Sequence, residues 1–259
     1  MTQTERRAFL TKKLLAEEPQ YRKIAIPQDE AGQKQLLRSL MNVRIPRQIS
    51  DDFLTIQDEY LREELAQKEI TDIADLTPIA NGMYLWQGDI TTLRCDAIVN
   101  AANSGMTGCY VPCHRCIDNC IHTYAGIQLR QECAAIMREQ GHEEETGKAK
   151  ITGAYNLPCK YVLHTVGPII SGPLTKRDEE LLASCYRSCL ELAEQHGVQS
   201  IAFCCISTGE FHFPNDRAAE IAVRTVREYR SENNSNIKVI FNVFKDVDYE
   251  IYHKLLTAN

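Results

Sequence analysis

A short stretch in the middle of the chain gathers side chains that could hold a metal ion. Four cysteines and two histidines occur within fourteen residues: Cys109, Cys113, His114, Cys116, Cys120 and His122. Thiolates and imidazoles are ligands that Zn²⁺ prefers, and in a reducing compartment such a cluster indicates metal rather than disulfides. Cys113 and Cys116 also form a C-x-x-C pair, which leaves a redox pair open as an alternative. A closed structural site is a further alternative, with Cys113, Cys120 or His122 as the fourth ligand.

Three polar loops, each placed after a predicted strand, could bind the parts of a nucleotide. In residues 88–90 the carboxylate of Asp89 could accept a bond from an exocyclic amine, although Asp is also common at helix caps. Residues 100–105 offer amide side chains for hydroxyl groups, and they could equally form a turn. Residues 206–211 precede a predicted helix, so their backbone N–H groups could surround an anionic diphosphate without any lysine.

The first 80 residues are predicted to form a helical extension. Apolar residues recur at helical spacing in three segments, which Pro27 and Pro46 separate because proline breaks helices. The apolar faces consist of Leu10, Leu14 and Leu15; Leu36, Leu37, Leu40 and Met41; and Phe53, Leu54, Tyr60, Leu61 and Leu65. The simplest role of this extension is to pack against the domain that follows.

From Met83 onward the pattern changes to strands that alternate with helices. Strands are predicted near residues 84–86, 97–99, 150–155, 161–166, 200–205 and 238–244, and helices at 177–195, at 216–229 and after Asp246. This alternation predicts a three-layer α/β/α domain. In such folds the loops at the carboxyl ends of the strands build the binding site, so the polar loops should meet there.

Composition restricts the classes of partner. The chain has 259 residues, of which 44% are hydrophobic and 25% charged, enough for a well-buried core. Its 35 acidic residues exceed its 29 Lys and Arg, giving a formal charge of −6 that disfavours nucleic acid as a partner. No apolar run approaches the roughly 20 residues of a membrane span, and the N-terminus lacks the apolar core of a secretory signal. We therefore expect a cytoplasmic protein without a membrane partner.

Taken together, three ordered motifs resemble the macrodomain family. They are GDIT at residues 88–91, DAIVNAANS at 96–104 and ISTGEFHFP at 206–214. The resemblance covers about residues 83–256 and implies a macrodomain over residues 81–259, with a mixed central sheet and the helical extension of residues 1–80 before it. It also implies binding of ADP-ribose, which several branches of the family hydrolyse from modified proteins.

The Cys-rich stretch departs from the glycine-rich loop that usually follows the second motif. This departure resembles the zinc-dependent branch found in microbes, often beside sirtuin-type ADP-ribosyltransferases. The resemblance implies that Cys109, His114 and Cys116 hold one Zn²⁺ per chain. Three protein ligands would leave the fourth position for water or substrate.

The same resemblance assigns the remaining site residues. Asp89 and the Ile90 amide would hold the adenine, and Ser207, Thr208, Gly209, Glu210 and Phe211 would surround the diphosphate. Asn103 and Asp118 would act at the distal ribose as catalytic residues. Alternative roles are turn formation for Asn103 and helix capping for Asp118, while His122 and His164 are expected to be packing residues.

The predicted function is a zinc-dependent hydrolase that removes mono-ADP-ribose from modified protein side chains. A carboxylate linkage is favoured because an acylal-type bond needs less leaving-group help than an N-glycoside. The metal would either polarise a ribose oxygen or lower the pKa of a bound water, and spacing alone does not distinguish these roles. The alternative function is a reader that binds ADP-ribose without cleaving it.

Overall fold

The N-terminal segment folds into three helices whose first turns are capped by side chains. In the computed structural model, which describes residues 1–258, α1 spans Gln3–Glu17, α2 spans Glu30–Val43 and α3 spans Asp51–Ala66. The caps are Thr2, Asp29 and Ser50, and each side chain accepts a hydrogen bond from a backbone N–H of the first turn. A short 3₁₀ helix, η1, spans Pro19–Tyr21. The helical extension predicted from the apolar periodicity is therefore present.

The three helices enclose a small apolar core of their own. Its fully buried members include Leu10 of α1, Leu37 of α2 and Phe53 of α3. Ile127, which begins the second helix after the Cys-rich loop, belongs to the same core, so the bundle packs against the main domain. After α3 the chain forms β1 (Thr71–Asp72) and η2 (Ile73–Asp75), and β1 pairs with β3 (Leu93–Arg94) in a separate two-stranded sheet.

The main domain is built on a six-stranded sheet with the order β2-β8-β7-β4-β6-β5. Its strands are β2 (Met83–Gln87), β4 (Ala97–Ala102), β5 (Ala149–Gly153), β6 (Tyr161–Val166), β7 (Ser200–Phe203) and β8 (Lys238–Val243). Only β5 runs antiparallel to its neighbour, so the sheet is mixed as predicted. The carboxyl ends of β2, β4, β6, β7 and β8 consequently share one edge.

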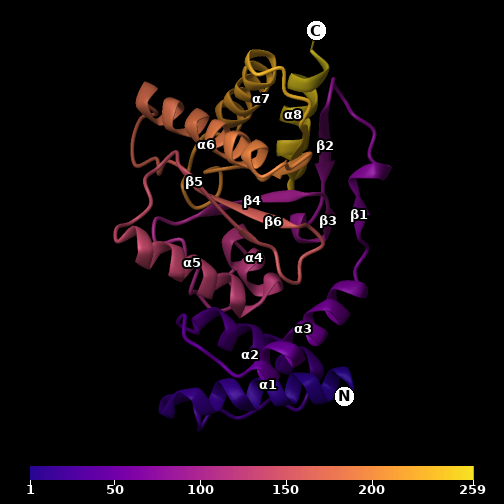
Figure 1. Ribbon diagram of the computed structural model, residues 1–259, viewed down its shortest axis with the longest axis vertical. Coiled ribbons are helices and arrows are strands. Elements are labelled where there is room, and N and C mark those ends of the chain that lie inside the picture. Colours follow the sequence, from indigo (N-terminus) through magenta and orange to yellow (C-terminus); the bar gives the residue numbers. More distant parts are fainter. Residues whose placement is uncertain (259) are drawn as a thin grey trace.

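Helices cover both faces of this sheet (Figure 1). On the side of the N-terminal bundle lie α4 (Ile117–Ala125) and α5 (Ile127–Gln140), and on the other lie α6 (Lys176–Gln195), α7 (Asn215–Glu232) and α8 (Asp246–Thr257). A short 3₁₀ helix, η3, spans Ile90–Thr92. The central strands read as nearly continuous apolar runs because they are buried on both faces. The predicted three-layer α/β/α architecture is confirmed.

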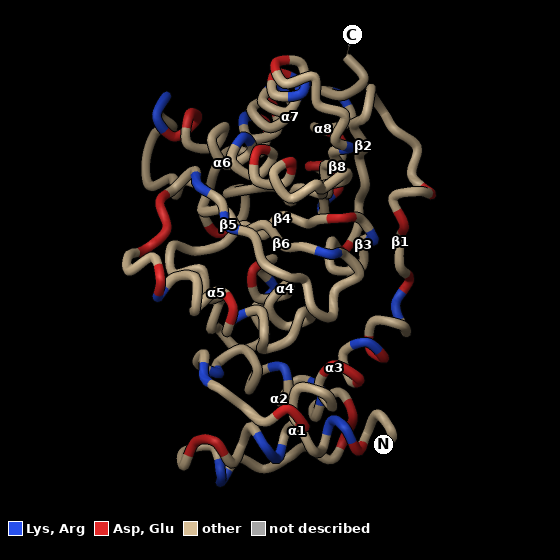
Figure 2. The backbone as a smooth tube through the Cα atoms, viewed as in Figure 1, with Lys and Arg blue, Asp and Glu red and all other residues tan. Residues whose placement is uncertain are grey.

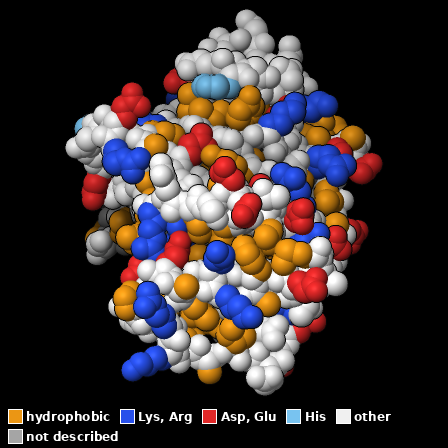
Figure 3. Space-filling model, turned by 60° about the horizontal axis from the view of Figure 1, so that its bottom comes forward, with side chains coloured by type: hydrophobic (Ala, Val, Ile, Leu, Met, Phe, Trp, Pro, Cys, Tyr) orange, Lys and Arg blue, Asp and Glu red, His pale blue; other side chains and the backbone are white. Residues whose placement is uncertain are grey.

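The charged residues of both signs lie mainly on the helices and loops (Figure 2). On the face seen when the bottom of the Figure 1 view is turned forward, basic and acidic side chains are interspersed (Figure 3). Within residues 1–258, no helix combines the length and apolar character that crossing a membrane would require.

The sequence-based strand ends need one correction at the second polar loop. We predicted that the strand ends near Val99 and that Asn100 belongs to the loop, whereas β4 continues to Ala102. Asn100 is therefore a fully buried strand residue opposite His164 of β6. Its amide points into the interior, where it contacts a residue of the site.

Candidate functional site

The Cys-rich loop connects β4 to α4 and is held against α4 near both ends. Gly108 has a φ of 84°, and a Cβ there would lie 2.7 Å from Cγ of His122, so this close approach requires glycine. At the other end Cys116 is the N-cap of α4, and its Sγ accepts a hydrogen bond from the Asn119 N–H at 3.4 Å. The loop therefore has one defined path across the carboxyl end of β4.

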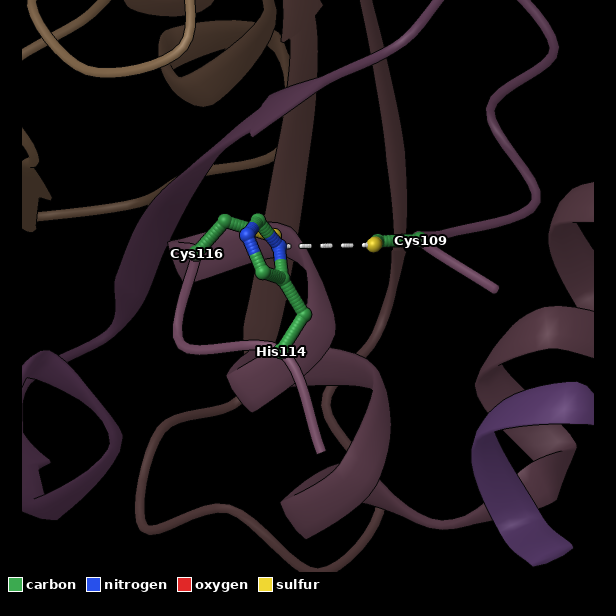
Figure 4. A group of neighbouring side chains, drawn as sticks. All are labelled: Cys109, His114 and Cys116. Carbon is green, nitrogen blue, oxygen red and sulfur yellow. Dashed lines mark hydrogen bonds between the residues drawn. The ribbon is translucent and has the colours of Figure 1, made fainter. Parts of the chain in front are cut away.

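Three side chains of this loop converge as a set of potential metal donors, Cys109, His114 and Cys116, called the donor set below. The Sγ of Cys109 lies 3.6 Å from Nδ1 of His114 (Figure 4). The donor atoms of Cys109, His114 and Cys116 all lie within 4.8 Å of one another. Tetrahedral Zn²⁺, with bonds of about 2.3 Å to sulfur and about 2.0 Å to nitrogen, would hold sulfur and nitrogen about 3.5 Å apart. The spacing of this donor set therefore fits Zn²⁺.

The other two thiols of the loop region face α2 instead of the donor set. The Sγ of Cys113 lies 3.2 Å from Oγ of Ser39, and the Sγ of Cys120 lies 3.6 Å from a guanidinium nitrogen of Arg38. Neither thiol, nor His122, belongs to the group formed by Cys109, His114 and Cys116. The geometry therefore favours the set of three ligands over the closed set of four.

The redox alternative also finds little support. All eleven cysteines of the chain are free thiols, including both members of the C-x-x-C pair. Burial raises the pKa of Cys116 above its usual value, although the hydrogen bond from the Asn119 N–H lowers it. A reactive thiol needs a depressed pKa, so this environment is unlike that of a redox cysteine.

Asp118 follows the donor set in the first turn of α4 and is only 5% exposed. Its Oδ1 accepts a hydrogen bond from Nδ2 of Asn100 at 2.8 Å, and its Oδ2 accepts one from Nδ2 of Asn103 at 3.3 Å. Burial raises the pKa of Asp118 to about 6, while the two amides lower it. The alternative of helix capping is wrong, because Cys116 caps α4.

Asn103 shapes the loop and also contacts Asp118. Its Oδ1 accepts a hydrogen bond from the Gly105 N–H at 3.0 Å, which is the turn role considered from the sequence. Its Nδ2 donates to the Gly108 carbonyl at 3.2 Å as well as to Asp118. Turn formation and positioning of the carboxylate therefore coexist in this one side chain.

Buried polar groups support the Asp118 carboxylate from behind. His164 is fully buried, with Nδ1 3.1 Å from Nδ2 of Asn100 and Nε2 2.9 Å from Oγ1 of Thr152. Because the Asn100 amide donates to both Asp118 and His164, Nδ1 of His164 is the acceptor and its proton lies on Nε2. Burial lowers the pKa of His164 to about 3, so the ring is neutral.

A second group of potential ligand atoms lies in the interior and consists of His122, Cys133 and His164. All three residues are buried, and His164 already has a partner on each ring nitrogen. The Nε2 of His122 lies 3.5 Å from Oδ1 of Asp118, and burial lowers the pKa of His122 well below its usual range. These contacts agree with packing roles for both histidines.

The loop after β7 turns back on itself and reaches His114 of the donor set. Ser207 has a positive φ of 66°, and its carbonyl accepts a hydrogen bond from the Phe213 N–H at 2.9 Å. The Phe211 carbonyl accepts one from the Ile170 N–H at 2.9 Å. Oε1 of Glu210 lies 3.7 Å from Nε2 of His114, so the Cys-rich loop and the predicted diphosphate loop are neighbours.

At the β2 end of the same edge, Asp89 has a structural role. Its Oδ1 accepts hydrogen bonds from the N–H and the hydroxyl of Thr91 at 3.0 and 2.6 Å, and it caps η3. Its Oδ2 lies 3.5 Å from Nζ of Lys68. Beside it, Phe244 directly follows β8 with 76% of its surface exposed, which offers a flat apolar face next to this loop.

The sequence interpretation found the donor set but missed several of its neighbours. Asn100 stands within the quoted second motif, and only the misplaced strand end hid its contact with Asp118. Phe244 carried the signal of an aromatic residue directly after an apolar strand. The contact between His114 and Glu210 joins residues 96 positions apart in the chain and has no local sequence signal.

The polar loops described above all leave the carboxyl ends of parallel strands. In layered α/β folds that edge is where nucleotide ligands bind. This arrangement defines an α/β/α protein whose polar loops form a candidate site at the carboxyl ends of its parallel strands.

Comparison with known proteins assigns the chain to a family within this class. Residues 99–222 match the Macro domain. A protein-ADP-ribose hydrolase of Treponema medium is 64% identical over 261 residues, covering 99% of this chain and 100% of that protein. A protein of the same name from Staphylococcus aureus strain MSSA476 is 56% identical over 220 residues, covering 84% and 82%. The Trypanosoma brucei macrodomain in complex with ADP-ribose is 31% identical with a TM-score of 0.67, covering 85% of this chain and 94% of that structure. This chain therefore belongs to the macrodomain family.

Proposed function

We propose that this protein is a zinc-dependent hydrolase that removes mono-ADP-ribose from modified protein side chains. The names of the Treponema and Staphylococcus relatives support the hydrolysis of protein-linked ADP-ribose. The observation that carries the proposal is the position of the Cys109, His114 and Cys116 donor set directly before Asp118 on the strand-end edge. A reader that only binds nucleotide has no need of metal ligands beside a buried carboxylate.

The donor chemistry supports one Zn²⁺ per chain, held by Cys109, His114 and Cys116. The distance of 3.6 Å between Cys109 Sγ and His114 Nδ1 suits two ligands of a single tetrahedral ion. When bound, the ion would supply Lewis-acid chemistry at the ribose that carries the protein linkage.

Different residues of the protein bind the diphosphate, the adenine and the distal ribose of ADP-ribose. Backbone amides of residues 207–211 hold the diphosphate, because a turn of successive N–H groups favours negative charge. Asp89 and the Ile90 amide hold the adenine, and the exposed ring of Phe244 offers it a stacking surface. Asn103 orients the distal ribose through its amide.

Asp118 acts as the base in the proposed hydrolysis. The bond between the ribose C1″ and the side-chain oxygen breaks, and the leaving group departs as a carboxylate. Water supplies a hydroxyl group to C1″, and its other proton passes to the Asp118 carboxylate and from there to solvent. The hydrogen bonds from Asn100 and Asn103 fix the orientation of that carboxylate. A carboxylate leaving group suits this site because it departs without an acid to protonate it, unlike the amide nitrogen of an N-glycoside.

The proposal is tested by incubating the purified protein with an auto-modified ADP-ribosyltransferase, with and without a chelator, and measuring free ADP-ribose. We expect release that the chelator abolishes and added Zn²⁺ restores. Cys109→Ser should lose most of the activity, whereas Cys159→Ser, a matched change outside the loop, should keep it.

Other outcomes would overturn parts of the proposal. Full release in the presence of chelator would reject the role of zinc. Binding of ADP-ribose without any release, with Zn²⁺ supplied, would identify a reader. Release from a hydroxylamine-resistant linkage alone would exclude the carboxylate ester as the substrate.

A further inference from the structure

The helix α2 of the N-terminal bundle contacts the Cys-rich loop through several polar groups. The guanidinium of Arg38 donates hydrogen bonds to the His114 carbonyl at 2.7 Å and to Oδ1 of Asn119 at 3.0 Å. One turn further along α2, Oδ1 of Asn42 accepts a hydrogen bond from the Cys113 N–H at 2.8 Å. The Cys113 N–H and the His114 carbonyl are thus both hydrogen-bonded to a helix that lies more than 70 residues earlier in the chain.

The loop needs such support because its backbone is strained at this point. Cys113 has a φ of 54°, a left-handed conformation that costs a residue with a Cβ roughly 1–2 kcal/mol. This residue directly precedes His114, so its conformation sets the direction of the imidazole. A strained residue persists only where its surroundings hold it, and the side-chain Oδ1 of Asn42, which accepts the Cys113 N–H, provides that contact.

The support is itself anchored in the interior. Asn42 is 1% exposed, and its Nδ2 donates to Oγ1 of Thr123 in α4 at 2.8 Å. Arg130 of α5 donates to the Asn42 and Arg44 carbonyls at 2.7 and 2.8 Å, which fixes the end of α2. The position of Asn42 against the loop is therefore fixed, because α4 and α5 hold its side chain and the end of α2 in place.

We infer that α2 organises the Cys-rich loop before metal binds, with Arg38 and Asn42 as positioning residues for His114. This inference rests on the proposed function, since it concerns the affinity of the same Cys109, His114 and Cys116 set. A side chain that is already held in its binding position loses less conformational freedom when the ion binds. Preorganisation therefore strengthens the binding of the ion and slows its release. The N-terminal helices would then be part of the metal site, although no residue of theirs contributes a ligand.

The test compares Arg38→Ala and Asn42→Ala with Lys34→Ala in the full-length protein. Lys34 is a matched control because it lies on α2 but pairs with Glu64 of α3 at 3.0 Å instead of the loop. Two quantities are measured: the rate at which Zn²⁺ passes to a chromophoric chelator, and the hydrogen exchange of amides 109–116 in metal-free protein. We expect Zn²⁺ release at least 10-fold faster in both variants, with the control within 2-fold of wild type. Exchange of the Cys113 amide should accelerate in Asn42→Ala.

Conservative variants keep the test decisive. Arg38 is half-buried, so Arg38→Ala should fold even if Asn42→Ala does not. Arg38→Lys should restore part of the slow release, because a single ammonium can still donate to the His114 carbonyl. Zn²⁺ release unchanged in the folded variants, or unchanged exchange at residues 109–116, would overturn the inference. A wild-type protein that takes up no Zn²⁺ would instead overturn the proposed function, and the exchange data would still show whether α2 holds the loop.

Discussion

At the scale of single residues, the candidate site depends on how a buried carboxylate is kept in one orientation. Asp118 accepts from Asn100 and Asn103, and Asn100 is in turn oriented by the neutral ring of His164. Hydrogen bonds thus link Asp118 of α4, Asn100 of β4, His164 of β6 and Thr152 of β5. Such a network resists rotation of the carboxylate, which is what a positioned base requires.

Asp118→Asn should therefore reduce the release of ADP-ribose by about 10²-fold or more, because an amide cannot accept the proton. The side chain keeps its shape, so the affinity for free ADP-ribose should change much less than the rate. Single-turnover assays and calorimetric titration measure the two quantities separately. Asp178→Asn at the start of α6 is the matched control and should leave both unchanged. An unaltered rate in Asp118→Asn would show that the carboxylate only supports the loop.

Glu210 is the second residue whose role can be isolated. Its carboxylate lies 3.7 Å from Nε2 of His114, on the side of the ring opposite the sulfur of Cys109. A carboxylate beside a metal-binding imidazole strengthens the ligand, and its loss costs about 10-fold or more in affinity at well-ordered sites. The Glu210 side chain is 72% exposed, so we expect Glu210→Gln to weaken Zn²⁺ binding by only about 3- to 10-fold.

Chelator competition would measure this loss, with Glu220→Gln on α7 as the control. Glu220 pairs with Arg217 in the same helix, and its replacement should leave Zn²⁺ affinity unchanged. Equal affinities for wild type and Glu210→Gln would mean that the contact between the two loops has no effect on the metal site.

At the scale of elements, the strands are fastened at the edge opposite the site. Asp96, just before β4, accepts hydrogen bonds from the N–H groups of Gln199 and Ser200 at 3.0 and 3.1 Å and from Nζ of Lys160 at 2.7 Å. It thereby joins the amino ends of β4, β6 and β7. Burial would raise the pKa of Asp96, but the bonds from Lys160 and Gln199 outweigh it and lower the pKa below its usual value.

Because its pKa is lower in the folded state, Asp96 stabilises the fold above its unfolded pKa of about 3.9 and loses that contribution as pH falls through the folded value. Asp96→Asn should reduce the free energy of unfolding by about 1–3 kcal/mol at pH 7. The difference from wild type should shrink as the pH falls below about 3.9 and through the lowered pKa of the folded state. Urea unfolding across this range measures it, with the exposed Asp75→Asn as control. A difference that stays constant with pH would contradict the role of the charged carboxylate.

The sequence predicted the elements that leave a local pattern, such as apolar spacing or a motif. It did not predict contacts between residues that are far apart in the chain. Apolar spacing identified the bundle helices, because Leu10 and Leu37 pack on faces that repeat every turn. The order of the three motifs predicted that the polar loops lie together, since the carboxyl ends of parallel strands share one edge of the sheet. Asn100 was assigned to the loop because an amide in a fully buried strand contradicts strand propensity, and only its partners Asp118 and His164 explain it. The contacts of Arg38 and Asn42 with the loop span more than 70 residues, so no periodicity could reveal them.

At the scale of the whole molecule, the bundle and the α/β/α domain share residues at their boundary. Ile127 belongs to the apolar core of the bundle although it begins α5. Arg130, one turn later and 5% exposed, donates to the carbonyls of Met41, Asn42 and Arg44 at the end of α2. These carbonyls lack helical partners, and a buried cation at a helix C-terminus satisfies both their hydrogen bonding and the helix dipole.

This shared boundary predicts that the two parts unfold together. Trp86 in β2 is the only tryptophan, so its fluorescence reports on the sheet, while far-UV circular dichroism also reports on α1–α3. With Zn²⁺ held constant, the two urea curves should coincide in wild type. Arg130→Met should separate them, with helical signal lost at lower urea, because it removes charged hydrogen bonds worth about 1.5–3 kcal/mol each. Arg138→Met changes an exposed arginine of the same helix and should leave the curves coincident. Two transitions in the wild-type protein would show that the bundle unfolds independently of the α/β/α domain. Coincident curves in Arg130→Met would show that Arg130 does not couple the two parts.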